Sequence, residues 1–351
     1  MLKKRNKILF ALILMATLFT TGCFFDADKE DSNKHSPTSV ARTTTLPKES
    51  EAERNTVTTT VTTTVTTTFV TTTTSEVTTE EETTIETEVL TESPTVANSR
   101  EMPSGIMEMI EAKKRDYPGI EIGVGIYSLD KQEQYEYNQN AVISSGCTVK
   151  AAYALFVLKS CEQQDIDIYN YYLEYQEGMK NGGSGTIKNS EYGTMYSVSE
   201  LLELLLGVSD NTAYNILLSR FPLNDFQTFL DSIGGQKLNG CRFGATTVTA
   251  RKNEWFALLN YINSGSRYSD VLRQDITNTN YCYLAQGMEC DHEFMHKSGW
   301  SYGSTYSCAC DCAVFDNKYL VVVLTQDYNV VDSYVNVVAS IGWSVEDELL
   351  S

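Results

Sequence analysis

A long tract of threonine and valine marks a part of this chain that cannot form a hydrophobic core and sets it apart from the part that can. Its centre, Thr56–Val65, reads TVTTTVTTTV, and the tract turns acidic around Glu80–Glu82. It shows no helical periodicity and no aromatic cluster, and it offers too little apolar surface to offset the conformational entropy lost on folding. We therefore predict a disordered, solvated stalk over residues 23–100 and one folded domain over residues 101–351.

The segment before the stalk has the features of a secretory signal peptide over residues 1–22. A basic start, Lys3–Lys7, precedes the apolar stretch Ile8–Phe19, which is too short for a comfortable membrane span. Gly22-Cys23 resembles a bacterial lipoprotein cleavage box, although Thr20 replaces the usual leucine. We expect Cys23 to be lipidated, so that a lipid anchor holds an extracytoplasmic protein at the cell membrane. The alternative is an uncleaved N-terminal anchor.

The charge of the chain limits its partners. The formal net charge is −19 at pH 7, spread between the stalk and the domain. Because like charges repel, this balance argues against nucleic acid and against an anionic membrane surface as binding partners.

Apolar periodicity within residues 101–351 predicts strands at both ends and helices between them. Apolar residues alternate over Ile120–Leu129, and Gln132–Tyr137 follows as a hairpin partner. The continuous apolar run Tyr319–Thr325 indicates a central strand. This order predicts an α+β fold, with an antiparallel sheet built from both ends of the domain and an inserted helical subdomain. The other expected strands are Glu293–Lys297 and Cys308–Phe315, and the expected helices are Pro103–Arg115, one starting at Cys147, Val198–Leu206 capped by Ser197 or Ser199, Thr212–Leu218, Leu223–Ile233, Ala250–Ile262 and Asp332–Trp343.

The stretch Ser144–Lys150 places a reactive side chain at a helix start. Small polar residues precede Cys147, and the good helix formers Ala151–Leu158 follow. Lys150 lies three residues further on and on the same helix face. The positive end of the helix dipole and the ammonium group both favour the thiolate of Cys147, whereas burial opposes it. The alternative is a buried cysteine that packs as a small hydrophobic residue.

Three short motifs follow one another along the chain: Cys147-Thr148-Val149-Lys150, Ser209-Asp210-Asn211 and Lys297-Ser298-Gly299. Their order resembles the S-x-x-K, S-D-N and K-T/S-G motifs of class A β-lactamases and penicillin-binding proteins, with cysteine in place of the nucleophilic serine. Three motifs in this order are far more specific than any one of them. The resemblance extends to the flanking segments Gly183–Ile187, Tyr196–Leu218 and Thr247–Arg251, covers residues 101–351, and implies an α/β/α sandwich.

The resemblance also implies a role for each motif. Cys147 takes the position of the nucleophile and Lys150 that of the base, while Ser209 relays a proton to the leaving nitrogen. The backbone N–H groups of Cys147 and Trp300 form an oxyanion hole. The implied substrate-binding residues are Asn211 for the amide side chain, Lys297 and Ser298 for the carboxylate, and Gly299 and Trp300 beside them. Taken singly, the second motif could be helix capping and the third a strand end followed by a turn.

Two departures from the family pattern bear on activity. The nucleophile position holds cysteine, which can still form an acyl-enzyme. The segment between Leu218 and Thr246 contains no glutamate to activate a deacylating water, and Asp225 and Asp231 lie on a predicted helix. We therefore expect slow deacylation of an adduct formed with a β-lactam or a peptidoglycan stem peptide. The alternatives are a non-catalytic pseudoenzyme that binds cell-wall peptide or a protein partner, and a β-lactam sensor, for which the sequence shows no signalling domain.

The chain has nine cysteines, and Cys23 and Cys147 leave seven to explain. Cys308, Cys310 and Cys312 alternate on one strand face. That spacing could hold a soft metal, but no histidine lies between these residues, so we interpret them as core. Cys282 and Cys290 could form a disulfide. We expect no metal ion and no cofactor.

Overall fold

The computed structural model describes residues 98–302, 307–328 and 334–350. The predicted signal peptide, Cys23 and nearly all of the predicted stalk lie outside these residues. The described residues all fall within one unit of the chain. Among them, no helix combines the length and the apolar character that crossing a membrane requires.

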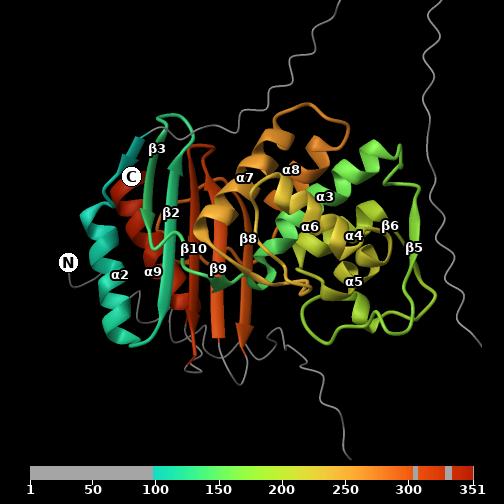
Figure 1. Cartoon of the computed structure of the whole chain (residues 1–351), viewed down its shortest axis with the longest axis horizontal. Coiled ribbons are helices and arrows are strands. Elements are labelled where there is room, and N and C mark those ends of the chain that lie inside the picture. The colour runs from blue at the N-terminus through green and yellow to red at the C-terminus, as the bar shows by residue number, and fades with distance from the viewer. Residues whose placement is uncertain (1–97, 303–306, 329–333, 351) are drawn as a thin grey trace, which may run out of the picture. The chain divides into compact units, whose positions relative to one another are not determined.

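A six-stranded sheet lies at the centre of the domain, in the order β1-β3-β2-β10-β9-β8 (Figure 1). Neighbouring strands are antiparallel, except that β1 runs parallel to β3. All nine residues of β10 are buried, which confirms the prediction of a central strand. The strands of the sheet are β1 (Asn98–Arg100), β2 (Glu121–Ser128), β3 (Glu133–Tyr137), β8 (Phe294–Tyr302), β9 (Ser307–Phe315) and β10 (Tyr319–Asp327).

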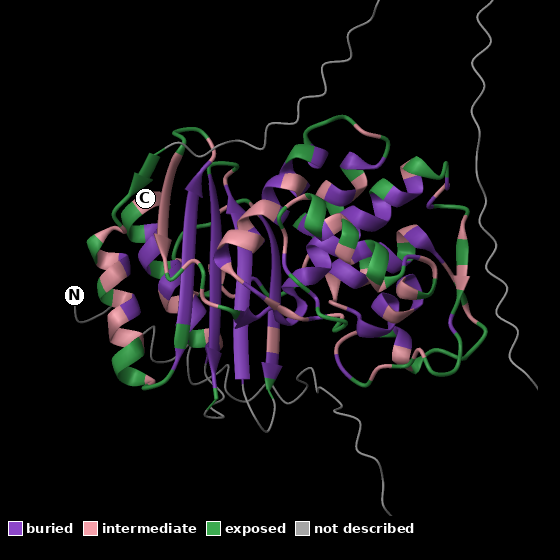
Figure 2. Ribbon diagram, viewed as in Figure 1, coloured by how far each residue is buried: buried purple, intermediate pink, exposed green. Residues whose placement is uncertain are grey.

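Helices cover both faces of this sheet, as the α/β/α prediction requires. On one face, α2 (Ser104–Asp116) and α9 (Tyr334–Val345) contribute to an apolar cluster that includes Ala309 and Ala313 of β9. On the other face, Cys310 of β9 belongs to the cluster formed with the inserted helices. The central strands are therefore buried along their length (Figure 2).

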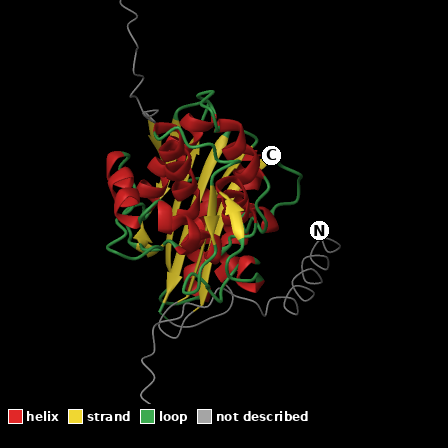
Figure 3. Ribbon diagram, turned by 90° about the vertical axis from the view of Figure 1, so that its right-hand side faces the viewer, coloured by secondary structure: helices red, strands yellow, loops and turns green. Residues whose placement is uncertain are grey.

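The inserted region lies between β3 and β8 in the sequence, and Figure 3 views the domain from this side. Ser197, not Ser199, caps its second helix, because the Ser197 hydroxyl accepts from the Glu200 amide and the Glu200 carboxylate accepts from the Ser197 amide. The helices are α3 (Val149–Gln163), α4 (Val198–Gly207), α5 (Asn211–Arg220), α6 (Leu223–Ser232), α7 (Val248–Ile262) and α8 (Ser269–Thr277), and two short ladders pair β4 (Ile143–Ser144) with β7 (Ala245–Thr246) and β5 (Tyr172–Glu174) with β6 (Met195–Ser197).

The structure differs from the sequence predictions in several places, among them β1 (Asn98–Arg100), which lies within the predicted disordered stalk but pairs with β3 in the sheet. β8 continues to Tyr302 instead of ending at Lys297, because pairing with β9 holds small polar residues in a strand conformation. The helix α8 was not predicted, because its few apolar residues are helical mainly through their packing against the core. The disulfide that the sequence left open between Cys282 and Cys290 is not formed, since both side chains are thiols, the first buried and the second exposed.

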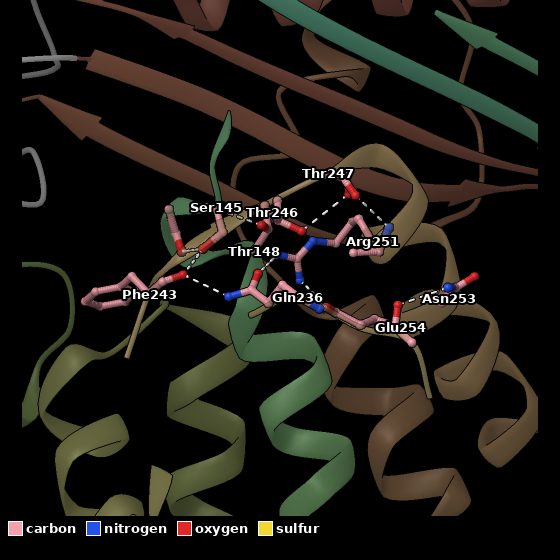
Figure 4. Close-up of polar contacts among 12 residues, drawn as sticks. Ser145, Thr148, Gln236, Phe243, Thr246, Thr247, Arg251, Asn253 and Glu254 are labelled. Atoms are coloured by element: carbon pink, nitrogen blue, oxygen red, sulfur yellow. Dashed lines mark hydrogen bonds and ion pairs between the residues drawn. The ribbon is translucent and has the colours of Figure 1, made fainter. Parts of the chain in front are cut away.

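A buried chain of polar contacts supports the loop that precedes α3 (Figure 4). Arg251 pairs with Glu254 on the same helix turn and donates to Gln236. The Gln236 side chain donates in turn to the backbone oxygen of Phe243 over 3.1 Å, and the hydroxyl of Ser145 donates to that same oxygen. Burial raises the pKa of the Glu254 carboxyl, although the Arg251 guanidinium opposes this rise. The contacts of Arg251 with Gln236, and of Gln236 with Phe243, therefore connect Arg251 to the loop before α3.

We expect Arg251→Met to lower the free energy of unfolding by about 3–5 kcal/mol, because it leaves the buried carboxylate of Glu254 without its cation. The additional change Glu254→Leu should restore most of the loss, since it removes that charge. The exposed pair of Arg267 with Asp165 supplies the control: Arg267→Met should cost less than about 1 kcal/mol. Urea unfolding of the three variants measures these differences, and equal losses for the two arginine variants would contradict the interpretation.

Candidate active site

Cys147 lies where the loop turns into the first inserted helix. A single 3₁₀ turn, Gly146–Thr148, leads directly into α3, so the predicted position at the helix start is confirmed. The residue is buried, with 5 % of its surface exposed. The helix dipole therefore acts on a thiol that is largely withdrawn from water.

Two glycines allow the backbone of this turn to touch the backbone of β8. Gly146 has a φ of +51°, which favours glycine, and a Cβ atom there would lie 3.3 Å from the amide nitrogen of Trp300. A Cβ atom at Gly299 would clash with the amide nitrogen of Cys147. The contact brings together the two amides that sequence analysis assigned to an oxyanion hole. The close contact also explains why the third motif ends in glycine, since a side chain at Gly299 would not fit against this turn.

The ammonium group of Lys150 is buried in a cage of oxygen atoms and aromatic rings. Its Nζ donates to the backbone oxygen of Ser209 and to Oδ1 of Asn211, each over 2.6 Å, and to Oγ of Ser209 over 3.3 Å. The rings of Tyr214 and Phe243 lie with their centroids 6.0 and 5.8 Å from Nζ, close enough for cation–π attraction. The structure therefore brings Lys150 and the second motif together, as predicted.

Asn211 connects the lysine with the thiol. Its Oδ1 atom, which accepts from Lys150, lies 3.9 Å from Sγ of Cys147. Its Nδ2 atom donates to Oδ1 of Asn181 over 3.3 Å. One amide thus contacts the candidate base, the candidate nucleophile and a neighbouring loop.

Asp210 explains why the turn between α4 and α5 holds this shape. One carboxylate oxygen caps α5 by accepting from the amides of Thr212 and Ala213, and the other accepts from the amides of Thr186 and Ile187. These bonds hold Ser209, whose φ is +55°, in a conformation that non-glycine residues seldom adopt. Capping and site geometry, considered as alternatives from the sequence, therefore coexist in this motif.

The third motif lies on β8, the edge strand nearest to the Cys147 turn. Lys297 is 2 % exposed, and its Nζ donates to the backbone oxygen of Ser298 over 2.8 Å. In the strand register Lys297 lies opposite Cys312, and Ser298 lies opposite Asp311. Because side chains alternate along a strand, those of Lys297 and Ser298 occupy opposite faces of the sheet. The structure thus places Lys297, but not Ser298, on the face that bears the inserted helices.

Three thiols of β9 lie in the core behind this site. Cys308, Cys310 and Cys312 are fully buried in the cluster that includes Cys147. The thiol of Cys310 contacts the backbone oxygen of Ser144 over 3.2 Å, and burial raises its pKa. The prediction that these three cysteines share one face of the strand and belong to the core is confirmed.

Three residues that contact Lys150 or Asn211 were not predicted as site residues from the sequence. Phe243 and Tyr214 flank the ammonium of Lys150, and Asn181 holds Asn211, but none belongs to a recognisable motif. Two of them had a weak signal: Asn181 precedes a glycine-rich stretch, and Tyr214 lies in the segment Tyr196–Leu218 that contains the second motif.

The segment 219–246 contains two acidic residues, and neither is placed as a catalytic base. Asp225 lies in the first turn of α6, which confirms its predicted helical position. Asp231 lies on the same helix and pairs with Lys237 near the surface.

Comparisons with known proteins agree with this fold. A family model described as the β-lactamase enzyme family matches residues 105–349. A mutant of PBP-A, solved as an acyl-enzyme complex with penicillin G, shares 16 % identity and a TM-score of 0.58 over 71 % of this chain and 97 % of its own. A class A β-lactamase representative from Bacteroides cellulosilyticus shares 19 % identity and a TM-score of 0.58 over 70 % and 97 %.

The TLA-3 extended-spectrum β-lactamase shares 18 % identity and a TM-score of 0.60 over 70 % of this chain and 98 % of its own. No curated protein sequence matches the chain significantly. At these identities the structural likeness speaks for the fold alone, but the family model covers most of the chain. The three motifs, their meeting at one site and the matched residues together show that the chain belongs to the β-lactamase enzyme family.

Proposed function

We propose that this protein reacts covalently with β-lactams or with peptidoglycan stem peptides, using the thiol of Cys147 as the nucleophile. The observation that carries the proposal is the connection from Lys150 through Asn211 to Cys147, with Ser209 bound to the same ammonium. Membership of the β-lactamase enzyme family supports the substrate class. The fold shared with PBP-A, whose mutant was solved with penicillin G as an acyl-enzyme, supports a covalent adduct.

In the proposed acylation, the sulfur of Cys147 attacks the carbonyl carbon of the substrate, and the bond from that carbon to the amide nitrogen breaks. A thioester forms on Cys147. Lys150 acts here as the neutral amine: it takes up the proton of the thiol, and a proton passes on through the hydroxyl of Ser209 to the departing nitrogen, so that the step balances. The amides of Cys147 and Trp300 stabilise the negative oxygen, and Lys297 attracts the substrate carboxylate.

Hydrolysis of this thioester is proposed to be slow. A deacylating water needs a base, and the segment 219–246 supplies no glutamate. Asp225 and Asp231 are exposed on α6, whereas Cys147 is buried. A protein that captures its substrate and releases it slowly fits these residues better than a β-lactamase of high turnover.

A second candidate function is binding without chemistry. The burial of Cys147 favours this reading, because desolvation disfavours the thiolate that an attack requires. In that case the site would bind a cell-wall peptide or a protein partner, and no adduct would form.

We also propose that the chain is exported, cleaved before Cys23 and anchored by a lipid on that residue. The support is the basic and apolar start followed by Gly22-Cys23. The stalk would then hold the domain away from the membrane, since fully extended chain spans roughly 3.3–3.6 Å per residue.

Replacing Lys150 with methionine should lower the rate of acylation by a labelled penicillin about 10²–10⁴-fold, the usual contribution of a general base. Lys159→Met is the matched control, because Lys159 lies on the same helix but is exposed. Intact-protein mass at timed intervals gives both rates. Equal rates for the two variants would show that Lys150 is not the base.

The acyl adduct should persist once it has formed. Mixed with excess nitrocefin, the protein should open one equivalent of the lactam ring in a burst, with the opened product held as the acyl adduct, and then turn over slowly. Nitrocefin absorbance follows both phases. Sustained rapid hydrolysis without a burst would demand a deacylating base that the segment 219–246 does not provide.

Cys23→Ala should move the protein from the membrane fraction to the soluble fraction and abolish the lipid mass at the N-terminus. Cys241→Ala, which removes an exposed thiol of the domain, is the control and should leave the location unchanged. Membrane retention of Cys23→Ala with an unaltered N-terminal mass would refute the anchor.

A further inference from the structure

Three potential metal ligands from separate segments meet in the interior, on the opposite face of the sheet from the lysine of the third motif. Cys282 lies in the loop after α8, His296 on β8 and Asp311 on β9. One ligand atom from each lies within 4.8 Å of the other two. His296 and Asp311 are fully buried, and Cys282 is 7 % exposed. This arrangement belongs to none of the three motifs.

The hydrogen bonds of His296 leave one of its ring nitrogens facing another acceptor, and a cation between the two would stabilise this arrangement. Its Nε2 atom lies 3.2 Å from the backbone oxygen of Thr279, and because a carbonyl oxygen can only accept, Nε2 carries the proton. The other ring nitrogen, Nδ1, then presents a lone pair toward Oδ1 of Asp311, 3.4 Å away. The Cys282 side chain hydrogen-bonds Asp311, but between the Nδ1 atom of His296 and the carboxylate only a shared proton or a metal ion would turn two buried, facing acceptors into an attraction.

The surroundings hold these atoms as the outer shell of a metal site does. The second carboxylate oxygen of Asp311 accepts from the amides of Tyr283 and Leu284, over 2.7 and 3.2 Å. Thr279 orients His296 through its carbonyl oxygen, and its hydroxyl donates to the His296 backbone oxygen over 2.9 Å. Second partners of this kind fix the tautomer of a ligating histidine and the direction of a ligating carboxylate.

We propose that Cys282, His296 and Asp311 bind a divalent transition-metal ion, with Zn²⁺ the best fit. A thiolate, an imidazole nitrogen and a carboxylate oxygen are ligands that Zn²⁺ accepts in tetrahedral geometry, with a water molecule completing the set. Calcium and magnesium are disfavoured, because both prefer oxygen ligands. Binding displaces the proton of the Cys282 thiol, which passes to the solvent.

The bound ion would fasten the loop after α8 to the edge of the sheet. Ser298, the central residue of the third motif, lies directly opposite Asp311 in the register of β8 and β9. A metal at Asp311 would therefore stiffen the strand pair that carries Lys297. The site does not depend on acylation at Cys147, so it can be tested whether or not that reaction occurs.

The test begins with the purified full-length chain, freed of metal by a chelator and titrated with ZnCl₂. We expect one equivalent to bind tightly and the midpoint of thermal unfolding to rise by roughly 5–10 °C at a hundredfold excess over the dissociation constant. His296→Gln should abolish the shift. His292→Gln is the matched control, since His292 lies just before β8 but outside the cluster, and it should keep the shift.

A measurement with Co²⁺ on the unaltered chain keeps the proposal testable even if a variant fails to fold. Co²⁺ bound to the unaltered chain should show a near-ultraviolet charge-transfer band from a thiolate, and Cys282→Ser should remove it while Cys290→Ser does not. The proposal is overturned if Zn²⁺ leaves the unfolding midpoint unchanged, in which case a proton bridges His296 and Asp311. It is equally overturned if Co²⁺ binds without a thiolate band, or if His292→Gln abolishes the shift as well.

Discussion

The buried ammonium group of Lys150 is the charge on which the geometry of the site depends. A charge removed from water must find acceptors nearby, and Ser209 and Asn211 supply them. Lys150 belongs to α3, whereas its acceptors belong to the turn before α5. Satisfying one charge therefore fixes two helices relative to each other and brings an amide oxygen to within 3.9 Å of the sulfur of Cys147.

The sheet fixes the other side of the site through contact of backbone with backbone. Gly146 and Gly299 allow the turn at Cys147 to lie directly against β8, where side chains would keep them apart. Behind the loop, the buried pair of Arg251 and Glu254 completes its support. Cys147, the proposed nucleophile, is thus held from three directions by elements that are distant in the sequence, and the proposed acyl transfer would benefit from such preorganisation.

Much of the fold was predictable because its signals are local. The continuous apolar run of β10 and the capping residue Ser197 each determine an element without help from the rest of the chain. The end of β8 and the existence of α8 were not predictable, since both depend on packing against partners elsewhere. The order of the motifs identified Cys147 and Lys150 as candidate site residues. No sequence signal predicted that Phe243 lies beside that lysine. A contact between residues far apart in the chain leaves no periodicity to detect.

The claim that Cys147 is a nucleophile is tested most directly by locating the bond that a penicillin forms. The full-length protein is exposed to penicillin, quenched in acid and digested, and the peptides are mapped by tandem mass spectrometry. We predict that the penicilloyl group lies on Cys147 and is removed by hydroxylamine at neutral pH, as a thioester should be. A penicilloyl group on another residue, or none on a folded protein, would contradict the account.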